Sequence, residues 1–212
     1  MATDEHYDNP DLERLTNARD TAALEALISR AARAGKGVPP VDRWEPEFRG
    51  DLDMEIKRDG TWFYKGTPIR RPALVQLFST VLRKDADGKT YLVTPVEKVG
   101  IHVEDAPFVA VELNVSGKGD DQVMTFRTNV GDVVEAGPEH PLRFENEEET
   151  GGLKPYLLVR GRLEALAARP VMYELADHGE EIEVDGKLMF AVRSRGASFP
   201  IMPAAKLEEL SQ

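Results

Sequence analysis

The chain has 212 residues, 41% of them hydrophobic, and a formal net charge of −11. This length suffices for one large or two small domains with real cores. The acidity disfavours nucleic acid and anionic membrane surfaces as partners, because both attract an excess of lysine and arginine. Since there is no cysteine, disulfides, thiolate zinc sites and iron–sulfur clusters are excluded.

No targeting segment is predicted. The first ten residues, MATDEHYDNP, are acidic and lack the apolar core of a signal peptide. No apolar run approaches the roughly 20 residues of a membrane span. We therefore expect a cytoplasmic protein with neither a nucleic-acid nor a membrane partner.

The first segment has a helical pattern from Asn9 to Gly35. Asn9 suits the N-cap and Pro10 the first helical position, and an apolar stripe follows at Leu12, Leu15, Leu24, Leu27 and Ile28. The stretch GKGVPP then ends the helix. We predict an N-terminal helical arm over residues 1–40, and its leucines leave a homo-oligomer open.

From Leu52 the apolar period changes to two, which is typical of a strand, and Asp59-Gly60 predicts a hairpin turn. A two-residue loop would pair Ile56 with Phe63. Trp62 and Tyr64 would then lie on the polar face of the hairpin.

The remaining elements follow from the same patterns. We predict helices at Pro72–Leu82 and Leu163–Ala176, the second interrupted by Pro170. Strands are expected at Lys89–Val93, Val99–Glu104, Phe108–Val115, Gln122–Thr128, Val133–Glu135, Leu142–Phe144 and Tyr156–Arg160, and a last hairpin at Glu181–Val184 and Lys187–Arg193.

The stretch KDADGKTYLV, residues 84–93, resembles a calcium loop at first sight. If Gly88 is the sixth position of an EF-hand loop, however, Arg83 stands first and Thr94 twelfth, where carboxylates are required. Asp-Gly between a helix and a strand predicts a tight turn instead.

Parts of the sequence match each other when the chain is shifted by 98 positions. Either an internal repeat or coincidence would explain this match. That shift places Arg71-Pro72 on Arg169-Pro170, and Asp87-Gly88-Lys89 on Asp185-Gly186-Lys187. We expect an α+β fold with two small sheet-containing modules of β-roll-like strands and packed helices. Their bounds are residues 41–106 and 107–212, after the N-terminal arm.

Three stretches resemble a proteobacterial family of unknown function: PPVDRWEPEFRGDLDMEI, DGTWFYKGTPIRRPALVQLF and LVTPVEKVGIHVEDAPF. The resemblance is specific over residues 39–110. It implies two α/β domains with repeated structural motifs and a fold considered new. It implies no activity, and a role in signal transduction has only been suggested for such proteins.

Catalytic and metal motifs are missing from the sequence. HExxH, GxSxG and phosphate-binding glycine loops do not occur, and the four histidines lack metal-ligand spacing. A hydrolase would need Ser194 or Ser198 to meet a base such as His178, and nothing in their spacing brings them together. We predict no catalytic residue, no metal and no cofactor.

The segment TPIRRP, residues 67–72, provides the candidate binding site. Arg70 and Arg71 precede a helix start, where the peptide dipoles already present positive charge. A bound anion or an acid such as Glu97 would offset this repulsion. We predict an anion-binding groove of Arg70, Arg71, Trp62 and Tyr64, with Lys98 as an outer candidate. The alternative is pairing of these arginines with the protein's own acids.

These patterns favour a non-enzymatic cytoplasmic ligand-binding or regulatory module, with a signal-transduction accessory as its extension. Its partner would be a small anionic ligand or a protein. One rival is a small enzyme that acts on an anionic substrate, with Glu97 or Glu104 as its base. The other is a scaffold that oligomerises through the N-terminal leucines.

Overall fold

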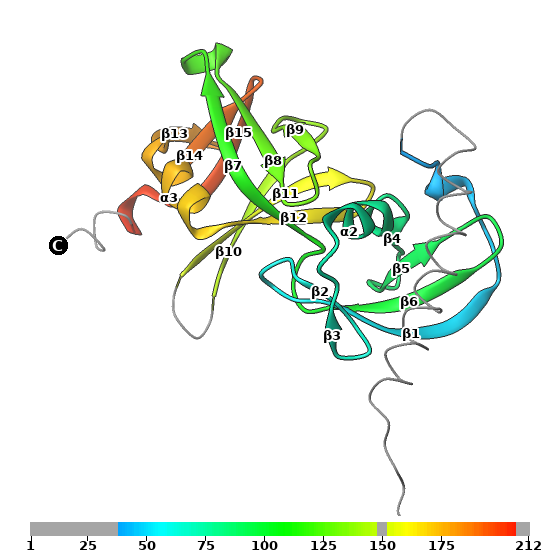
Figure 1. Cartoon of the computed structure of the whole chain (residues 1–212). Coiled ribbons are helices and arrows are strands. Elements are labelled where there is room, and N and C mark those ends of the chain that lie inside the picture. Colours follow the sequence, from blue (N-terminus) through cyan, green and yellow to red (C-terminus); the bar gives the residue numbers. More distant parts are fainter. Residues whose placement is uncertain (1–37, 148–151, 207–212) are drawn as a thin grey trace, which may run out of the picture.

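The computed structural model describes residues 38–147 and 152–206, and the predicted arm over residues 1–40 lies almost wholly outside these ranges. The described chain is mostly β, with two six-stranded curled sheets, one three-stranded sheet and two short α-helices (Figure 1). The expected two-domain organisation is present. The α+β class overstated the helix content, because several helix-like stretches are held in strands.

The first sheet contains β1 (Phe48–Ile56), β2 (Trp62–Tyr64), β3 (Thr67–Pro68), β4 (Leu82–Lys84), β5 (Thr90–Val93) and β6 (Lys98–Val103). Its strand order is β3-β2-β1-β6-β5-β4, with β1 parallel to β6 and every other pair antiparallel. The helix α2 (Pro72–Ser79) connects its two halves.

The second sheet contains β7 (Phe108–Ser116), β8 (Val123–Thr128), β9 (Val133–Glu135), β10 (Leu142–Asn146), β11 (Leu153–Arg160) and β12 (Leu163–Ala167). Its order is β10-β11-β12-β7-β8-β9, and β12 is parallel to β7. The connectivity of the first sheet is thus repeated: two three-stranded meanders join through the first strand of one and the last strand of the other.

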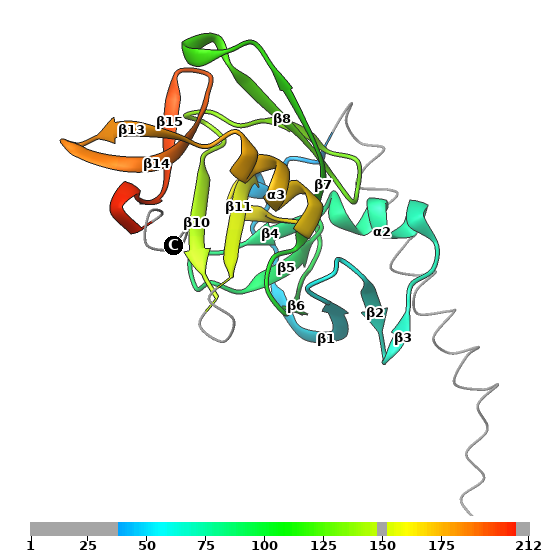
Figure 2. The same ribbon diagram turned by 90° about the vertical axis from the view of Figure 1, so that its left-hand side faces the viewer.

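The third sheet is a meander of β13 (Glu180–Val184), β14 (Lys187–Ser194) and β15 (Ala197–Pro203). It follows α3 (Arg169–Asp177), which packs on β7 and β11 (Figure 2). At the offset of 98 positions, α2, β4 and β5 correspond to α3, β13 and β14. The local order of elements therefore repeats, but the two copies lie in different sheets.

Two helices are shorter in the structure than the sequence pattern predicts. The segment 163–167, LEALA, is strand β12, because it pairs with β7 on one side and β11 on the other. Helix α2 ends at Ser79, and Leu82 begins strand β4 instead. In both places sheet pairing overrides helix propensity.

The turn predicted at KDADGK is confirmed. The amide of Asp85 donates to the Lys89 carbonyl at 3.0 Å, and Gly88 has a φ of +80°. No group of three or more metal-ligating side chains occurs within the described residues.

The predicted register of the first hairpin is wrong by one residue. Ile56 faces Trp62, and Met54 faces Tyr64, because the loop spans five residues and closes through Lys57 N–H to Thr61 O at 2.9 Å. A one-residue shift exchanges the faces of a strand. Trp62 and Tyr64 consequently lie on the buried face, with 1% and 8% of their surface exposed.

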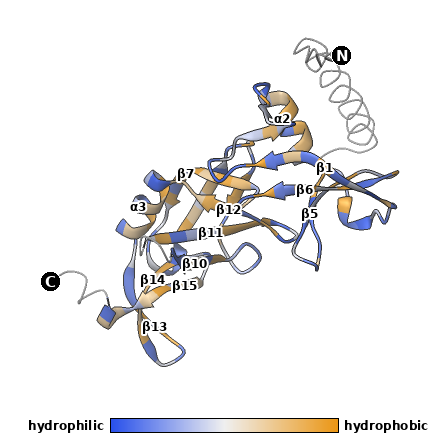
Figure 3. Cartoon of the chain, turned by 90° about the horizontal axis from the view of Figure 1, so that it is seen from below, coloured by the Kyte–Doolittle hydropathy of each residue, from blue (hydrophilic) through white to orange (hydrophobic). Residues whose placement is uncertain are grey.

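One hydrophobic core extends through both domains, and it joins residues such as Phe78 of α2 with Phe108 and Leu157 of the second sheet. Figure 3 shows apolar residues along α2, β7 and β12, where the domains meet. In the part of the chain described, no helix has the length and apolar character to cross a membrane.

Candidate functional site

A cavity of about 840 Å³ opens between the two domains, and we call it the interdomain cavity. The loop between β1 and β2 contributes Arg58 and Asp59 from the first domain. The second domain contributes side chains of β7, β11, β12 and α3. This volume is within the range of small-molecule sites.

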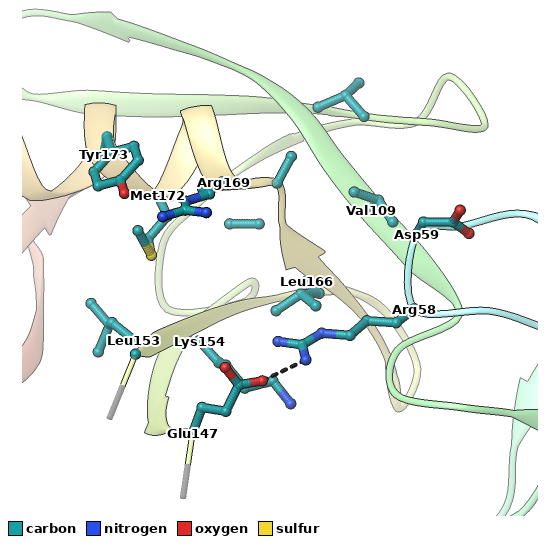
Figure 4. A pocket seen from close by; sticks show the side chains of 14 residues that line it. Arg58, Asp59, Val109, Glu147, Leu153, Lys154, Leu166, Arg169, Met172 and Tyr173 are labelled. Carbon is teal, nitrogen blue, oxygen red and sulfur yellow. Dashed lines mark hydrogen bonds and ion pairs between the residues drawn. The ribbon is translucent and has the colours of Figure 1, made fainter. Parts of the chain in front are cut away.

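The floor of the interdomain cavity is apolar. Leu166 of β12 and Val109 of β7 are buried beneath it, and Met172 of α3 lines its side (Figure 4). Val111 and Tyr173 stand at the rim with 39% and 52% of their surface exposed. Large apolar side chains exposed beside a concavity are typical of ligand or partner sites.

Asp105 lies behind the cavity and connects the domains. Its carboxylate accepts a hydrogen bond from Tyr156 Oη at 2.7 Å, and lies 2.5 Å from Lys154 Nζ and 3.7 Å from Arg58 Nε. Burial raises the pKa of Asp105, but the bonds from Lys154 and Tyr156 and the nearby positive charges outweigh it. The pKa therefore lies below its ordinary value, and the group is ionised.

Arg58 and Lys154 are both engaged by these acids. Arg58 also forms an ion pair with Glu147, and this hydrogen bond is the main cause of its raised pKa. Burial lowers the pKa of Lys154, but the bonds to Asp105 and Tyr156 and the attraction of their charges together outweigh burial and raise it. Both cations consequently carry their charge in the cavity wall.

Arg169 differs from the other two cations. It is the first residue of α3 and exposed, and its Nε donates to Tyr173 Oη at 3.2 Å. This bond raises its pKa. Within the described ranges, no carboxylate lies at ion-pair distance from its guanidinium group. Arg169 is thus available to an incoming anion.

The backbone places Arg169 at this rim. Ala168 is extended, with φ −60° and ψ 153°, and its amide donates to the Ala110 carbonyl of β7 at 2.8 Å. Pro170 then fixes the first turn of α3. No acidic residue occurs in that turn, as in the first turn of α2. The arrangement at Arg71-Pro72, an arginine followed by proline at the start of a helix, thus recurs at Arg169-Pro170, where the arginine lines the interdomain cavity.

The residues of the predicted groove do not share a cavity in the structure. Arg70 and Arg71 are exposed at the start of α2, whereas the Trp62 ring is enclosed in the core against Phe78. Lys98 forms an ion pair with Asp85 at 3.0 Å and lies over the Tyr91 ring. Anion binding by Arg70 and Arg71 stays a prediction.

The residues considered for catalysis have structural contacts. Ser194 is buried, donates to the Ala136 carbonyl at 2.7 Å and accepts from the Met124 amide. Glu104 accepts from the Arg58 amide at 3.2 Å, and so helps to hold the cavity loop.

The sequence pattern marked Arg169-Pro170 as a counterpart of Arg71-Pro72, but it did not indicate Arg58, Lys154, Leu166 and Tyr173 as cavity residues. They come from four separated segments. Their only local signal was the placement of Leu166 and Tyr173 in apolar patterns, which core residues share.

Comparisons with known proteins agree with this two-domain structure. The N-terminal domain of DUF1285, described as a domain of unknown function, matches residues 39–106, and the C-terminal domain of DUF1285 matches residues 107–201. A comparison with curated proteins gives no match.

Two crystal structures are similar. A DUF1285 family protein from Silicibacter pomeroyi DSS-3 has 52% identity and a TM-score of 0.76, over 85% of this chain and 97% of its own. A second, from Shewanella baltica OS155, has 24% identity and a TM-score of 0.47, over 59% of this chain and 91% of its own. The chain therefore belongs to the DUF1285 family, for which no function is assigned.

Proposed function

We propose that this protein is a non-enzymatic binding module that holds a small anionic molecule with an apolar body in the interdomain cavity. The observation that carries the proposal is the cavity itself, in which three cations, Arg58, Lys154 and Arg169, stand around an apolar floor in a chain of net charge −11. Convergent polar groups above apolar walls are the usual composition of a ligand site.

The chemistry of the wall favours binding over catalysis. A general base is most effective when its pKa is near the working pH. Asp105 has a lowered pKa and already accepts bonds from Lys154 and Tyr156. Each of its two oxygens already has a partner in the protein, which favours a role in holding the two domains together over removal of a proton from a ligand.

Both domains contribute to the cavity, which supports a regulatory role. A ligand that contacts Arg58 on one side and Arg169 on the other would add contacts across the domain junction. It would therefore stabilise one relative position of the domains. A partner protein could recognise that position, in line with the suggested link to signal transduction.

The test is a fragment screen by ligand-observed NMR, with a cavity-blocking variant. Val111→Trp fills the rim from a half-exposed position, so the fold should tolerate it. Val96→Trp is the matched control, because Val96 is 63% exposed and does not line the cavity. We expect carboxylate fragments to bind the wild type and Val96→Trp, and Val111→Trp to lose this binding. Hits that persist in Val111→Trp would contradict the proposal.

A further inference from the structure

The charges beside the floor of the interdomain cavity are not all paired. Arg58, Lys154 and Arg169 are its cations, and among the described residues Glu147 and the underlying Asp105 compensate two of them. Asp59 also lines the cavity, but its carboxylate accepts the Thr61 amide at 2.8 Å and is turned away from Leu166 (Figure 4). Asp59 keeps its negative charge but points away from the floor, so beside Leu166 three cations face two acids.

The excess charge is located at Arg169. Figure 4 shows its guanidinium group and that of Arg58 on opposite sides of Leu166. Arg58 faces Glu147 and Asp105, whereas Arg169 donates to the Tyr173 hydroxyl and lies over its ring, with no carboxylate of the described residues at ion-pair distance. An anionic head group at Arg169 would therefore meet one cation without a paired acid. A second cation, Arg58, lies across the floor and is partly neutralised by its acids.

The rest of the ligand must be apolar. Leu166, Val109 and Val111 present hydrocarbon below and beside the cations, and Tyr173 and Met172 continue this surface along α3. A free phosphate or sulfate would leave the exposed parts of Val111, Met172 and Tyr173 in contact with water. An alkyl or aryl group on them would bind favourably, because apolar surface of both is removed from water.

We infer that the ligand is a monocarboxylate with an alkyl or aryl body, rather than a phosphate dianion or a neutral lipid. This inference rests on the function proposed above. One excess positive charge complements one carboxylate, whereas a dianion would bring a second negative charge next to Glu147 and Asp105 without a cation to balance it.

Titration by NMR with octanoate, octyl phosphate and octan-1-ol tests this charge selection, because the three share one alkyl chain. We expect octanoate to bind roughly tenfold more tightly than octan-1-ol, and at least as tightly as octyl phosphate. In Arg169→Gln, octanoate should weaken by about tenfold, while octan-1-ol changes little. Arg162→Gln is the control, because Arg162 is an exposed arginine outside the cavity.

A second variant tests the charge count directly. Glu147→Gln removes one compensating acid and leaves two excess positive charges, so octyl phosphate should gain several-fold over octanoate. Equal binding of octanoate and octan-1-ol to the wild type, or an unchanged preference in Glu147→Gln, would overturn the inference. Failure of octanoate to bind at all would also overturn it.

These outcomes are distinct from failure of the proposed function. If neutral or cationic fragments bind the wild type and are lost in Val111→Trp, the cavity is a ligand site and only the monocarboxylate is wrong. If Val111→Trp reduces the binding of none of the fragments, the binding function itself is wrong.

Discussion

Asp105 shows what one buried carboxylate does at the junction of the two domains. It follows the first sheet directly, and it accepts contacts from Lys154 and Tyr156 of β11 in the second. Because these bonds and the nearby positive charges of Lys154 and Arg58 together outweigh burial, its folded-state pKa is below the ordinary 3.8. A lowered pKa means that the folded state binds the proton less readily than the unfolded state does. The ionised carboxylate therefore stabilises the fold above about pH 4.

Asp105→Asn should lower the free energy of unfolding by about 2 kcal/mol at pH 7, because Lys154 and Arg58 lose their shared acid. The difference from the wild type should shrink as the pH falls below about 4 and on through the lowered pKa of the folded carboxylate, where the wild type loses this charge as well. Urea denaturation at several pH values measures this. A difference that stays constant down to pH 2 would count against the argument.

Asp120→Asn is the control for that series. Asp120 pairs with Arg193 at 2.9 Å, but 88% of its side chain is exposed. Solvent screens such a pair, so its loss should cost less than about 1 kcal/mol.

At the scale of elements, the five-residue loop between β1 and β2 decides which face of the hairpin is buried and brings Arg58 to the cavity. Gly60 lies in this loop with a φ of +83°, and a Cβ there would lie 2.5 Å from Asn129 Nδ2 and 3.0 Å from Val109. Asn129 also accepts the Val109 amide through Oδ1. The loop therefore docks on the second domain through a glycine.

Gly60→Ala should destabilise the protein by about 2 kcal/mol or more, from the positive φ together with the steric contact. Gly88→Ala is a matched control, because its φ is +80° but no atom lies within 4 Å of the added Cβ. It should cost only about 1 kcal/mol. Equal losses for the two variants, measured by chemical denaturation, would show that the Asn129 contact is unimportant.

At the scale of the whole molecule, Arg160 connects the domains through their common core. Its guanidinium group donates to Asp132 at 2.6 Å and to the Ser79 carbonyl at the end of α2 at 2.7 Å. It also lies 4.7 Å from the centre of the Phe108 ring. Since the core is continuous, we expect the two domains to unfold as one cooperative unit.

Arg160→Ala should destabilise this unit by about 3 kcal/mol, because Asp132 and the Ser79 carbonyl lose their donor in a part-buried setting. Calorimetry of the wild type should give one transition with equal calorimetric and van't Hoff enthalpies. Arg195→Ala is the control. Arg195 pairs with Glu135 at the same 2.6 Å, but it is 56% exposed, so little should change. Two separate wild-type transitions would contradict the cooperative unit.

The sequence by itself determined the short-range features of this protein. Turns at Asp59-Gly60 and Asp87-Gly88, the start of α2 at Pro72 and most strand positions follow from residue types a few positions apart. These choices depend on local backbone geometry and on periodicity, which adjacent residues fully specify.

Only the tertiary structure decided which residues meet. The segment 163–167 became a strand because β7 and β11 offered it partners, and the hairpin register placed Trp62 in the core rather than in a groove. One cavity is lined by Arg58, Lys154 and Arg169 together, because the two sheets pack against each other across Asp105 and Arg160. Such contacts join positions far apart in the chain. They are selected by hydrophobic packing, which does not depend on how close two residues are in the sequence.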